Sequence, residues 1–151
     1  PSVEVPGRGF TSTWSPAGDK ILFSVNNYES NYNPTLYIMD GRINYLGTYQ
    51  QSLGVETWPE KCAFGSDSAV YCAVPRFLPA GSDLYPELAD NVPDDFYRID
   101  LTTGAKTLLA SPVSSSGYEN FTAESVFLSA GQEFLYFTDA ATSQVYKIRL
   151  K

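Results

Sequence analysis

One repeated pattern restricts what this chain can fold into. An aromatic residue, a short turn rich in Ser, Ala and Gly, and an apolar strand occur together at Trp14–Phe23 and at Phe127–Tyr136. These two segments align without a gap, and a shorter, degenerate copy covers Phe64–Tyr71. Each copy is followed by a strand with Tyr in its second position: Leu36–Asp40, Phe96–Asp100 and Val145–Arg149. Regular internal repeats mark stacked structural units, so the chain is expected to contain three similar units.

The local pattern of the chain is typical of β-strands. Short alternating or apolar runs are separated by Gly, Pro, Asn, Asp and Ser, and helical periodicity is nearly absent apart from one turn around Leu84–Ala89. The fold class is therefore expected to be all-β. The expected strands are Lys20–Val25, Thr35–Asp40, Ile43–Thr48, Lys61–Phe64, Ala69–Val74, Phe96–Leu101, Lys106–Ala110, Ser125–Leu128, Glu133–Asp139 and Gln144–Leu150.

Four strands in each unit of this length are typical of a propeller blade. We therefore expect a single propeller-type domain over residues 1–151, with three four-stranded antiparallel blades near residues 1–42, 43–101 and 102–151.

The first copy of the repeat resembles a known family. Trp14–Phe23 is similar to the W-S-P-D-G-K-x-I-x-F signature of WD40-like (PD40) blades, and Ile99–Lys106 is similar to the I-D-x-x-T-G turn between blades. Ala17 stands where the signature has Asp, and the aromatic residue of the later copies is Phe instead of Trp. The resemblance implies a TolB-like β-propeller, or the propeller domain of a prolyl-oligopeptidase-type peptidase.

Three blades are fewer than the roughly 4–8 that closed propellers use. A soluble monomer does not tolerate two large open apolar faces. Either this chain is part of a longer propeller that supplies the missing blades, or two copies pair as a homodimer that closes a six-bladed ring. An open or differently closed stack of sheets is the third alternative.

Composition excludes several functions. The chain has no His, which removes Ser-His-Asp and Cys-His nucleophilic sites and His-ligated zinc. Its net charge of −7 argues against nucleic acid as a partner. The sequence contains no nucleophile elbow, phosphate-binding loop or complete dinucleotide motif, so no catalytic residue, metal or cofactor is assigned. No apolar run reaches the roughly 20 residues of a membrane span.

Two cysteines indicate the compartment. If Phe64 pairs with Val70 across a short hairpin, Cys62 lies directly opposite Cys72, which allows a disulfide. The alternative is a pair of buried, reduced thiols. A disulfide favours an extracytoplasmic location, whether periplasmic, cell-surface or secreted. Anchoring by a segment upstream of residue 1 is left open.

Two insertions are the candidate binding surface. Asn26–Pro34 is rich in Tyr and Asn, which suits a recognition surface, and Pro75–Asp95 is long and acidic. Both lie between equivalent strands of their blades, so they are expected to project from the same end; the alternative is a structural cap. The candidate ligand- or partner-binding residues are Tyr28, Glu29, Tyr32, Phe77, Asp83, Tyr85 and Glu87.

The acidic insertion does not predict a metal site. Its carboxylates match no calcium-binding loop, so a solvated loop is expected, with apolar side chains that fold down and pack. The carboxylates are Asp83, Glu87, Asp90, Asp94 and Asp95, and the apolar side chains are Phe77, Leu78, Leu84, Tyr85 and Leu88.

Three functions fit these observations. The favoured one is a non-catalytic binding or scaffold module that contacts a protein or surface ligand, because propellers present loops at the ends of a rigid ring. The second is an enzyme part: either the accessory propeller of a hydrolase or peptidase, or a carboxylate-based hydrolase or lyase. The third is a structural subunit whose open faces join another chain.

Overall fold

The chain folds into three antiparallel sheets, as the repeats predict. The computed structural model describes residues 2–111, 113–114, 117–118 and 120–150. The strands are β1 (Arg8–Trp14), β2 (Lys20–Asn26), β3 (Thr35–Asp40), β4 (Gln51–Glu56), β5 (Cys62–Phe64), β6 (Ala69–Pro75), β7 (Asp94–Asp100), β8 (Lys106–Ala110), β9 (Val113–Ser114), β10 (Gly117–Tyr118), β11 (Ala123–Leu128), β12 (Phe134–Asp139) and β13 (Val145–Arg149). Three short 3-10 helices are η1 (Tyr28–Ser30), η2 (Pro59–Lys61) and η3 (Pro86–Ala89).

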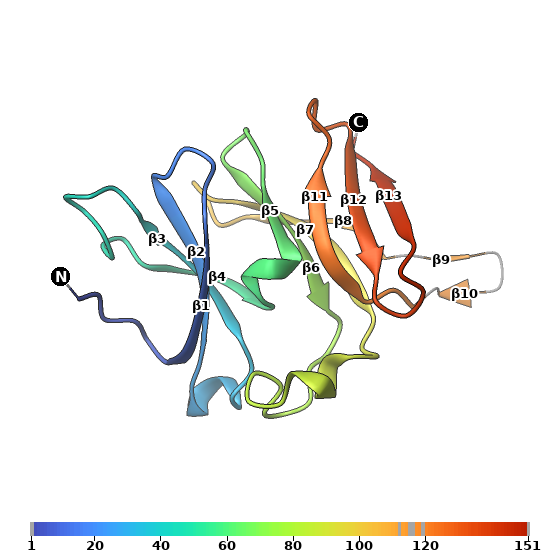
Figure 1. Ribbon diagram of the computed structural model, residues 1–151, viewed down its shortest axis with the longest axis horizontal. Helices are drawn as coiled ribbons and strands as arrows, with labels where there is room; N and C mark the ends of the chain where they lie inside the picture. Colours follow the sequence, from blue (N-terminus) through green and yellow to red (C-terminus); the bar gives the residue numbers. More distant parts are fainter. Residues whose placement is uncertain (1, 112, 115–116, 119, 151) are drawn as a thin grey trace.

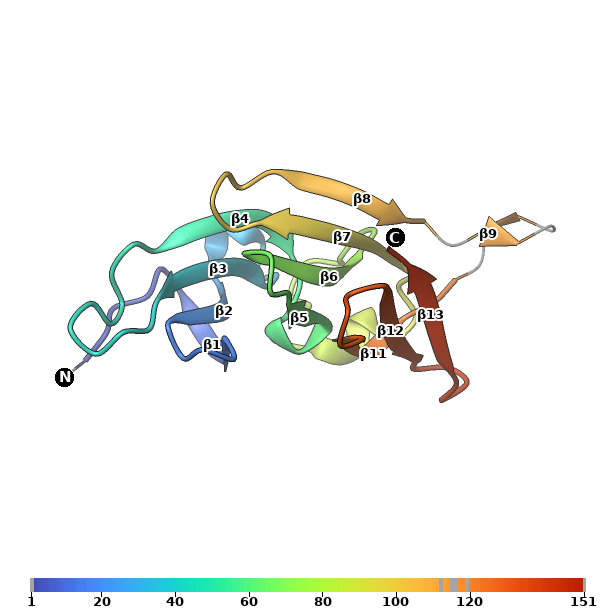
Figure 2. The same ribbon diagram turned by 90° about the horizontal axis from the view of Figure 1, so that it is seen from above.

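The three large sheets follow one another along the chain. Sheet 1 has the order β1-β2-β3-β4, sheet 2 the order β5-β6-β7-β8, and sheet 3 the order β11-β12-β13, while β9 and β10 form a separate small hairpin. Figures 1 and 2 show the sheets in a row, with β1, β5 and β11 along one side and β4 and β8 along the other. The all-β class is therefore confirmed.

Strand counts differ from the expectation in one sheet. Sheets 1 and 2 have four strands, but sheet 3 has three in the described part of the chain, because the expected strand Lys106–Ala110 pairs with β7 as β8 of sheet 2. The approximate blade boundaries at residues 42 and 101 each fall between the third and fourth strands of one sheet. The sheets themselves span residues 8–56, 62–110 and 123–149.

The expected strand Ile43–Thr48 is wrong. This segment is a turn closed by backbone hydrogen bonds from Asp40 N to Thr48 O (3.0 Å) and from Gly47 N to Asp40 O (3.1 Å). Gly47 has φ of +81°, a value that favours glycine, and it lies within this turn. The fourth strand of sheet 1 is instead β4, and neither β4 nor β1 is among the expected strands.

Two hydrophobic layers join the three sheets. The layer between sheets 1 and 2 contains eight buried side chains: Leu22, Leu36, Ile38, Leu53, Val55, Val70, Cys72 and Ile99. The layer between sheets 2 and 3 contains another eight: Ala69, Tyr71, Ala73, Phe96, Ala123, Val126, Leu135 and Phe137. Sheet 2 is therefore apolar on both faces, which is why β6 reads as a continuous apolar run.

All three sheets are stacked in the same sense. The repeated Tyr of the third strand always points to the preceding side: Tyr97 packs against the layer between sheets 1 and 2, and Tyr146 against the layer between sheets 2 and 3. Tyr37 of sheet 1 points to the outer face, where it packs with Phe23 and Met39. The same face of each repeat thus meets the sheet before it.

The structure shifts the alignment of the repeated turn by one residue. Ser15 accepts hydrogen bonds from the amides of Asp19 and Lys20, and Ser129 accepts the same pair from Glu133 and Phe134. Ser15 therefore corresponds to Ser129, whereas the ungapped sequence alignment placed it opposite Leu128.

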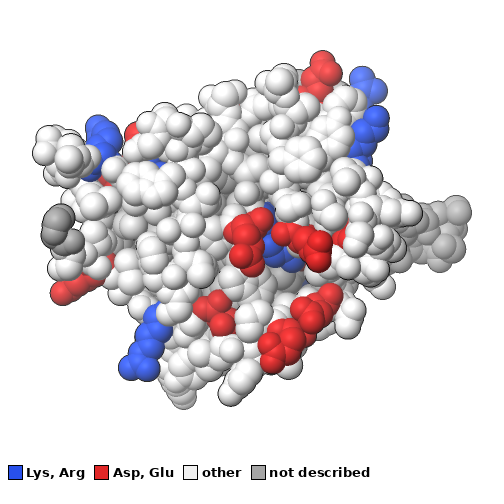
Figure 3. Space-filling view, in the orientation of Figure 1, with Lys and Arg blue, Asp and Glu red and all other residues white. Residues whose placement is uncertain are grey.

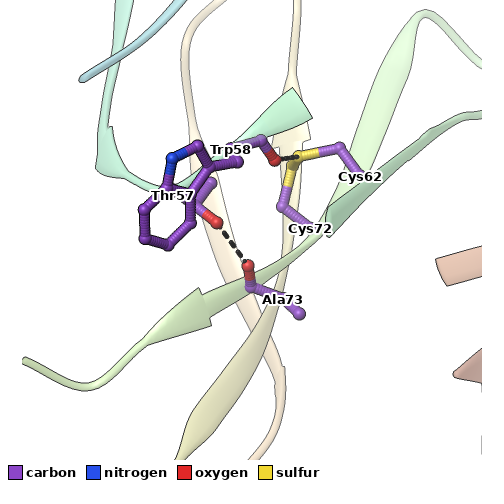
Figure 4. The surroundings of a disulfide bond; sticks show 5 residues. All are labelled: Thr57, Trp58, Cys62, Cys72 and Ala73. Atoms are coloured by element: carbon purple, nitrogen blue, oxygen red, sulfur yellow. Dashed lines mark hydrogen bonds between the residues drawn. A yellow bond between two sulfur atoms is a disulfide. The ribbon is translucent and has the colours of Figure 1, made fainter. Parts of the chain in front are cut away.

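The predicted disulfide is present. Cys62 pairs directly with Cys72 in the β5–β6 register, Phe64 pairs with Val70, and the two cysteines are bonded. Figure 4 shows the bond beside Trp58, whose carbonyl oxygen lies near Cys62, and beside the hydrogen bond from Thr57 Oγ1 to Ala73 O (2.8 Å). A disulfide of this kind is typical of an oxidising compartment.

The disulfide is expected to stabilise the folded chain. It closes a loop between residues 10 apart in sequence, so the double variant Cys62→Ala/Cys72→Ala should lose about 2–4 kcal/mol of unfolding free energy. Urea denaturation of the variant and the wild type measures the difference. Reductant should lower the midpoint of the wild type and leave that of the variant unchanged, and equal midpoints for both proteins would contradict the prediction.

Candidate functional site

Two long connections lie side by side at one end of the sheets. They are residues 27–34, between β2 and β3, and residues 76–93, between β6 and β7, and both lie at the lower edge of Figure 1. Three amides of the longer connection donate to the shorter one: Gly81 N to Asn31 O at 2.8 Å, Ser82 N to Asn33 Oδ1 at 3.1 Å, and Asp83 N to Tyr32 O at 3.1 Å. The exposed surface of these two connections is called the insertion face below.

The shorter connection is held by local hydrogen bonds. Asn27 accepts a bond from Ser30 N (2.9 Å) at the start of η1, and Ser30 Oγ donates to Asn33 O (2.8 Å). Asn31 and Tyr32 then take positive φ values of 54° and 56°. This backbone turns the carbonyls of both residues toward the longer connection, where they accept the bonds described above.

Asp83 joins the longer connection to sheet 1 and to the segment that follows it. Its Oδ1 accepts a hydrogen bond from Trp58 Nε1 (2.7 Å), and its Oδ2 accepts one from Asn26 Nδ2. Trp58 follows β4, and Asn26 is the last residue of β2. The candidate residue Asp83 therefore uses both carboxylate oxygens to position the insertion, beneath the surface on which the other candidates lie.

The remaining candidate residues form an exposed, largely aromatic surface. Tyr28 is 81% exposed, Phe77 62% and Tyr85 60%, and Tyr32 is also exposed and meets the Tyr28 ring edge to face. Glu29 and Glu87 are exposed on the same two connections. The structure thus brings candidates from two distant segments onto one surface.

The expected packing of the longer insertion is only partly correct. Leu78 packs against Trp58, Ala89 and Val92. The other four apolar side chains point to solvent instead: Phe77, Leu84, Tyr85 and Leu88. Leu84 and Leu88 therefore belong to the insertion face instead of the packed side of the loop. The sequence carries no signal for this, because apolar residues in a loop ordinarily indicate burial.

A cleft lies beside the insertion face. It has a volume of about 660 Å³, and its walls come from η2, η3 and the beginning of β11. Three carboxylates line it, from Glu60, Asp90 and Glu124. Figure 3 shows acidic side chains gathered around a basic one near the centre of this side of the molecule.

A buried ion pair lies at this cleft. Lys61 Nζ contacts Asp94 Oδ1 at 2.8 Å and Oδ2 at 2.7 Å, and Oδ2 also accepts a hydrogen bond from Ala123 N at 2.7 Å. Asp94 is completely buried, so burial raises the pKa of its carboxyl, while Lys61 and the Ala123 amide act in the opposite direction. The pair connects sheet 2 to the first strand of sheet 3.

Three carboxylates of the acidic insertion are bonded to other groups of the chain, whereas Glu87 and Asp90 are exposed as expected. Asp94 is buried against Lys61, Asp95 accepts a hydrogen bond from Arg76 Nε (2.8 Å), and Asp83 is bonded to two side chains. Within the described residues, no group of three or more Cys, Asp or Glu side chains is arranged to hold a metal ion.

Comparisons with known proteins do not extend these observations. Neither a family model nor a curated protein sequence matches the chain. Among the helices of the described residues, none has the length and apolar character needed to cross a membrane.

Removal of the buried cation should strongly destabilise the fold. The variant Lys61→Met leaves Asp94 buried without its partner, and the expected loss is about 3–5 kcal/mol of unfolding free energy at neutral pH. Without the ammonium group the pKa of Asp94 rises further. The loss should therefore shrink as the pH falls through this raised pKa and the carboxyl becomes protonated.

Urea denaturation at several pH values measures both effects. Lys106→Met is the matched control, because Lys106 is an exposed residue, and its cost should stay within about 0.5 kcal/mol. A Lys61→Met variant as stable as the control at neutral pH would show that the ion pair does not hold the sheets together.

Proposed function

We propose that this chain is a non-catalytic binding module of the WD40-like, TolB-like propeller type, and that the insertion face is its partner-binding surface. The same-sense stacking of three sheets with a shared Tyr position supports the propeller assignment. An extracytoplasmic location, whether periplasmic, cell-surface or secreted, is part of the proposal and agrees with the disulfide.

The observation that carries the binding function is the concentration of exposed aromatic rings on two hydrogen-bonded loops. Tyr28, Phe77 and Tyr85 present large, rigid rings to solvent. Exposed apolar patches on soluble proteins mark interaction sites. Aromatic side chains lose little conformational entropy on binding, so they are common at protein interfaces.

A protein is the partner that this surface suits best. The rings come from connections whose backbones are fixed to each other, so little ordering is required on binding. Glu29 and Glu87 lie among the rings and add negative charge. We therefore propose a partner that presents an apolar patch with basic residues at its edge.

Selection from a displayed peptide library tests the insertion face. Peptides that bind the wild-type chain should lose at least about tenfold in affinity for the double variant Tyr28→Ser/Tyr85→Ser, because truncation of aromatic contacts at an interface costs more than about 1 kcal/mol. Titration by biolayer interferometry measures each affinity.

The matched control is Tyr49→Ser. Tyr49 is equally exposed to solvent but lies on the connection between β3 and β4, at the opposite end of sheet 1. Peptide binding should be unchanged in this variant. Peptides that bind the double variant as tightly as the wild type would assign recognition to another surface and overturn the proposal.

A further inference from the structure

The amino-terminal segment covers part of the outer face of sheet 1. Val3 and Val5 pack against a cluster formed by Ile21, Phe23, Val25 and Met39. Two main-chain carbonyls of the segment accept hydrogen bonds from the sheet's connections: Glu4 O from Gln50 Nε2 at 2.7 Å and Pro6 O from Asn27 Nδ2 at 3.1 Å.

This segment packs against sheet 1 in the way that the fourth strand of one sheet packs against the next sheet along the chain. Leu53 and Val55 of β4 pack onto sheet 2, and Leu109 of β8 packs onto the layer in front of sheet 3. The chain later enters the first strand of the covered sheet: β4 precedes β5, β8 precedes β11 with the β9–β10 hairpin between them, and residues 2–5 precede β1. Residues 2–5 therefore occupy the place of a fourth strand that belongs to a preceding sheet.

Within the described residues, sheet 3 has no fourth strand. In sheets 1 and 2 the third strands, β3 and β7, pair on both sides, whereas β13 pairs with β12 alone in the described part of the chain. Its open backbone edge can accept one more strand. The outer face beside this edge is also uncovered, since Val145 is 59% exposed and Phe127 is exposed as well.

The outer faces of sheets 1 and 3 are of complementary kinds. We call the face of a sheet that is directed toward the next sheet along the chain its following face, and the opposite one its preceding face. Each contact between sheets inside the molecule joins the following face of one sheet to the preceding face of the next. Sheet 1 leaves its preceding face open, where Phe10 and Trp14 are exposed around a cavity of about 440 Å³, and sheet 3 leaves its following face open. Figures 1 and 2 place these two faces at opposite ends of one molecule.

We infer that a second copy of this chain supplies the missing contact: residues 2–5 of each copy pair with β13 of the other, and sheet 1 of each packs on sheet 3 of the other. One chain carries both the open face of sheet 1 and the open face of sheet 3, but these faces lie at opposite ends of the molecule and cannot meet within one chain. A two-fold axis satisfies both at once and leaves no open face. The inference rests on the propeller arrangement proposed above and makes no use of the insertion face.

Light scattering after size-exclusion chromatography tests the inference on the 151-residue chain. The wild type should elute with twice its chain mass of 16.6 kDa. Val5→Glu places a charge on the segment, and Val145→Glu places one on the exposed face of sheet 3; each should halve the measured mass. Leu84→Glu, on the insertion face, is the control and should remain a dimer.

Cross-linking identifies the contact independently of its strength. Glu4→Cys and Lys147→Cys chains, both altered at exposed positions, are mixed and treated with a short bismaleimide. A cross-linked dimer that forms only in the mixture supports the proposed pairing. A wild type that stays monomeric at all concentrations would overturn the inference, and so would a dimer that persists in both glutamate variants. Neither result would affect peptide binding at the insertion face.

Discussion

The face-to-face contact between sheets is the constraint on which the rest of this structure depends. Each sheet carries apolar side chains on both faces, so each face needs a neighbour that removes it from water. Sheet 2 meets this requirement within the chain, and sheets 1 and 3 meet it on one side each. The position of the insertions, the cleft and the open faces all follow from the order in which the sheets are stacked.

Polar groups determine how the candidate site is held on this stack. Asp83 receives hydrogen bonds from a residue at the end of β2 and from one after β4, which fixes the long insertion against sheet 1. Asp94 begins β7, receives the amide of Ala123 and pairs with Lys61, which fixes sheet 2 against sheet 3. Carboxylates that the composition suggested to be surface charges therefore bind neighbouring segments to one another. The exposed aromatic side chains take no part in these bonds and face the solvent.

Sequence reasoning predicted the register of the disulfide hairpin and the common end of the two insertions, but it missed details of the turns and the contacts between the insertions. The pairing of Cys62 with Cys72 follows from a hairpin register and was predicted correctly. The alignment of the repeated turns failed because Gln132, with φ of 54°, takes the place of Gly18, with φ of 72°; matching Gly18 to Gly131 moved the alignment by one residue. The contacts between the two insertions join residues about 50 positions apart, such as Ser82 with Asn33, and no local pattern encodes them.

The disulfide has a consequence beyond the hairpin that it closes. β5 is three residues long, and Lys61, the cation at the cleft, comes immediately before Cys62. The covalent bond therefore anchors the backbone of the cleft to β6, the strand at the centre of the molecule. In a reducing environment the three-residue ladder and the Lys61–Asp94 ion pair would have to hold this segment without the covalent bond. The redox state in which the chain matures therefore affects how firmly the middle of the stack is assembled.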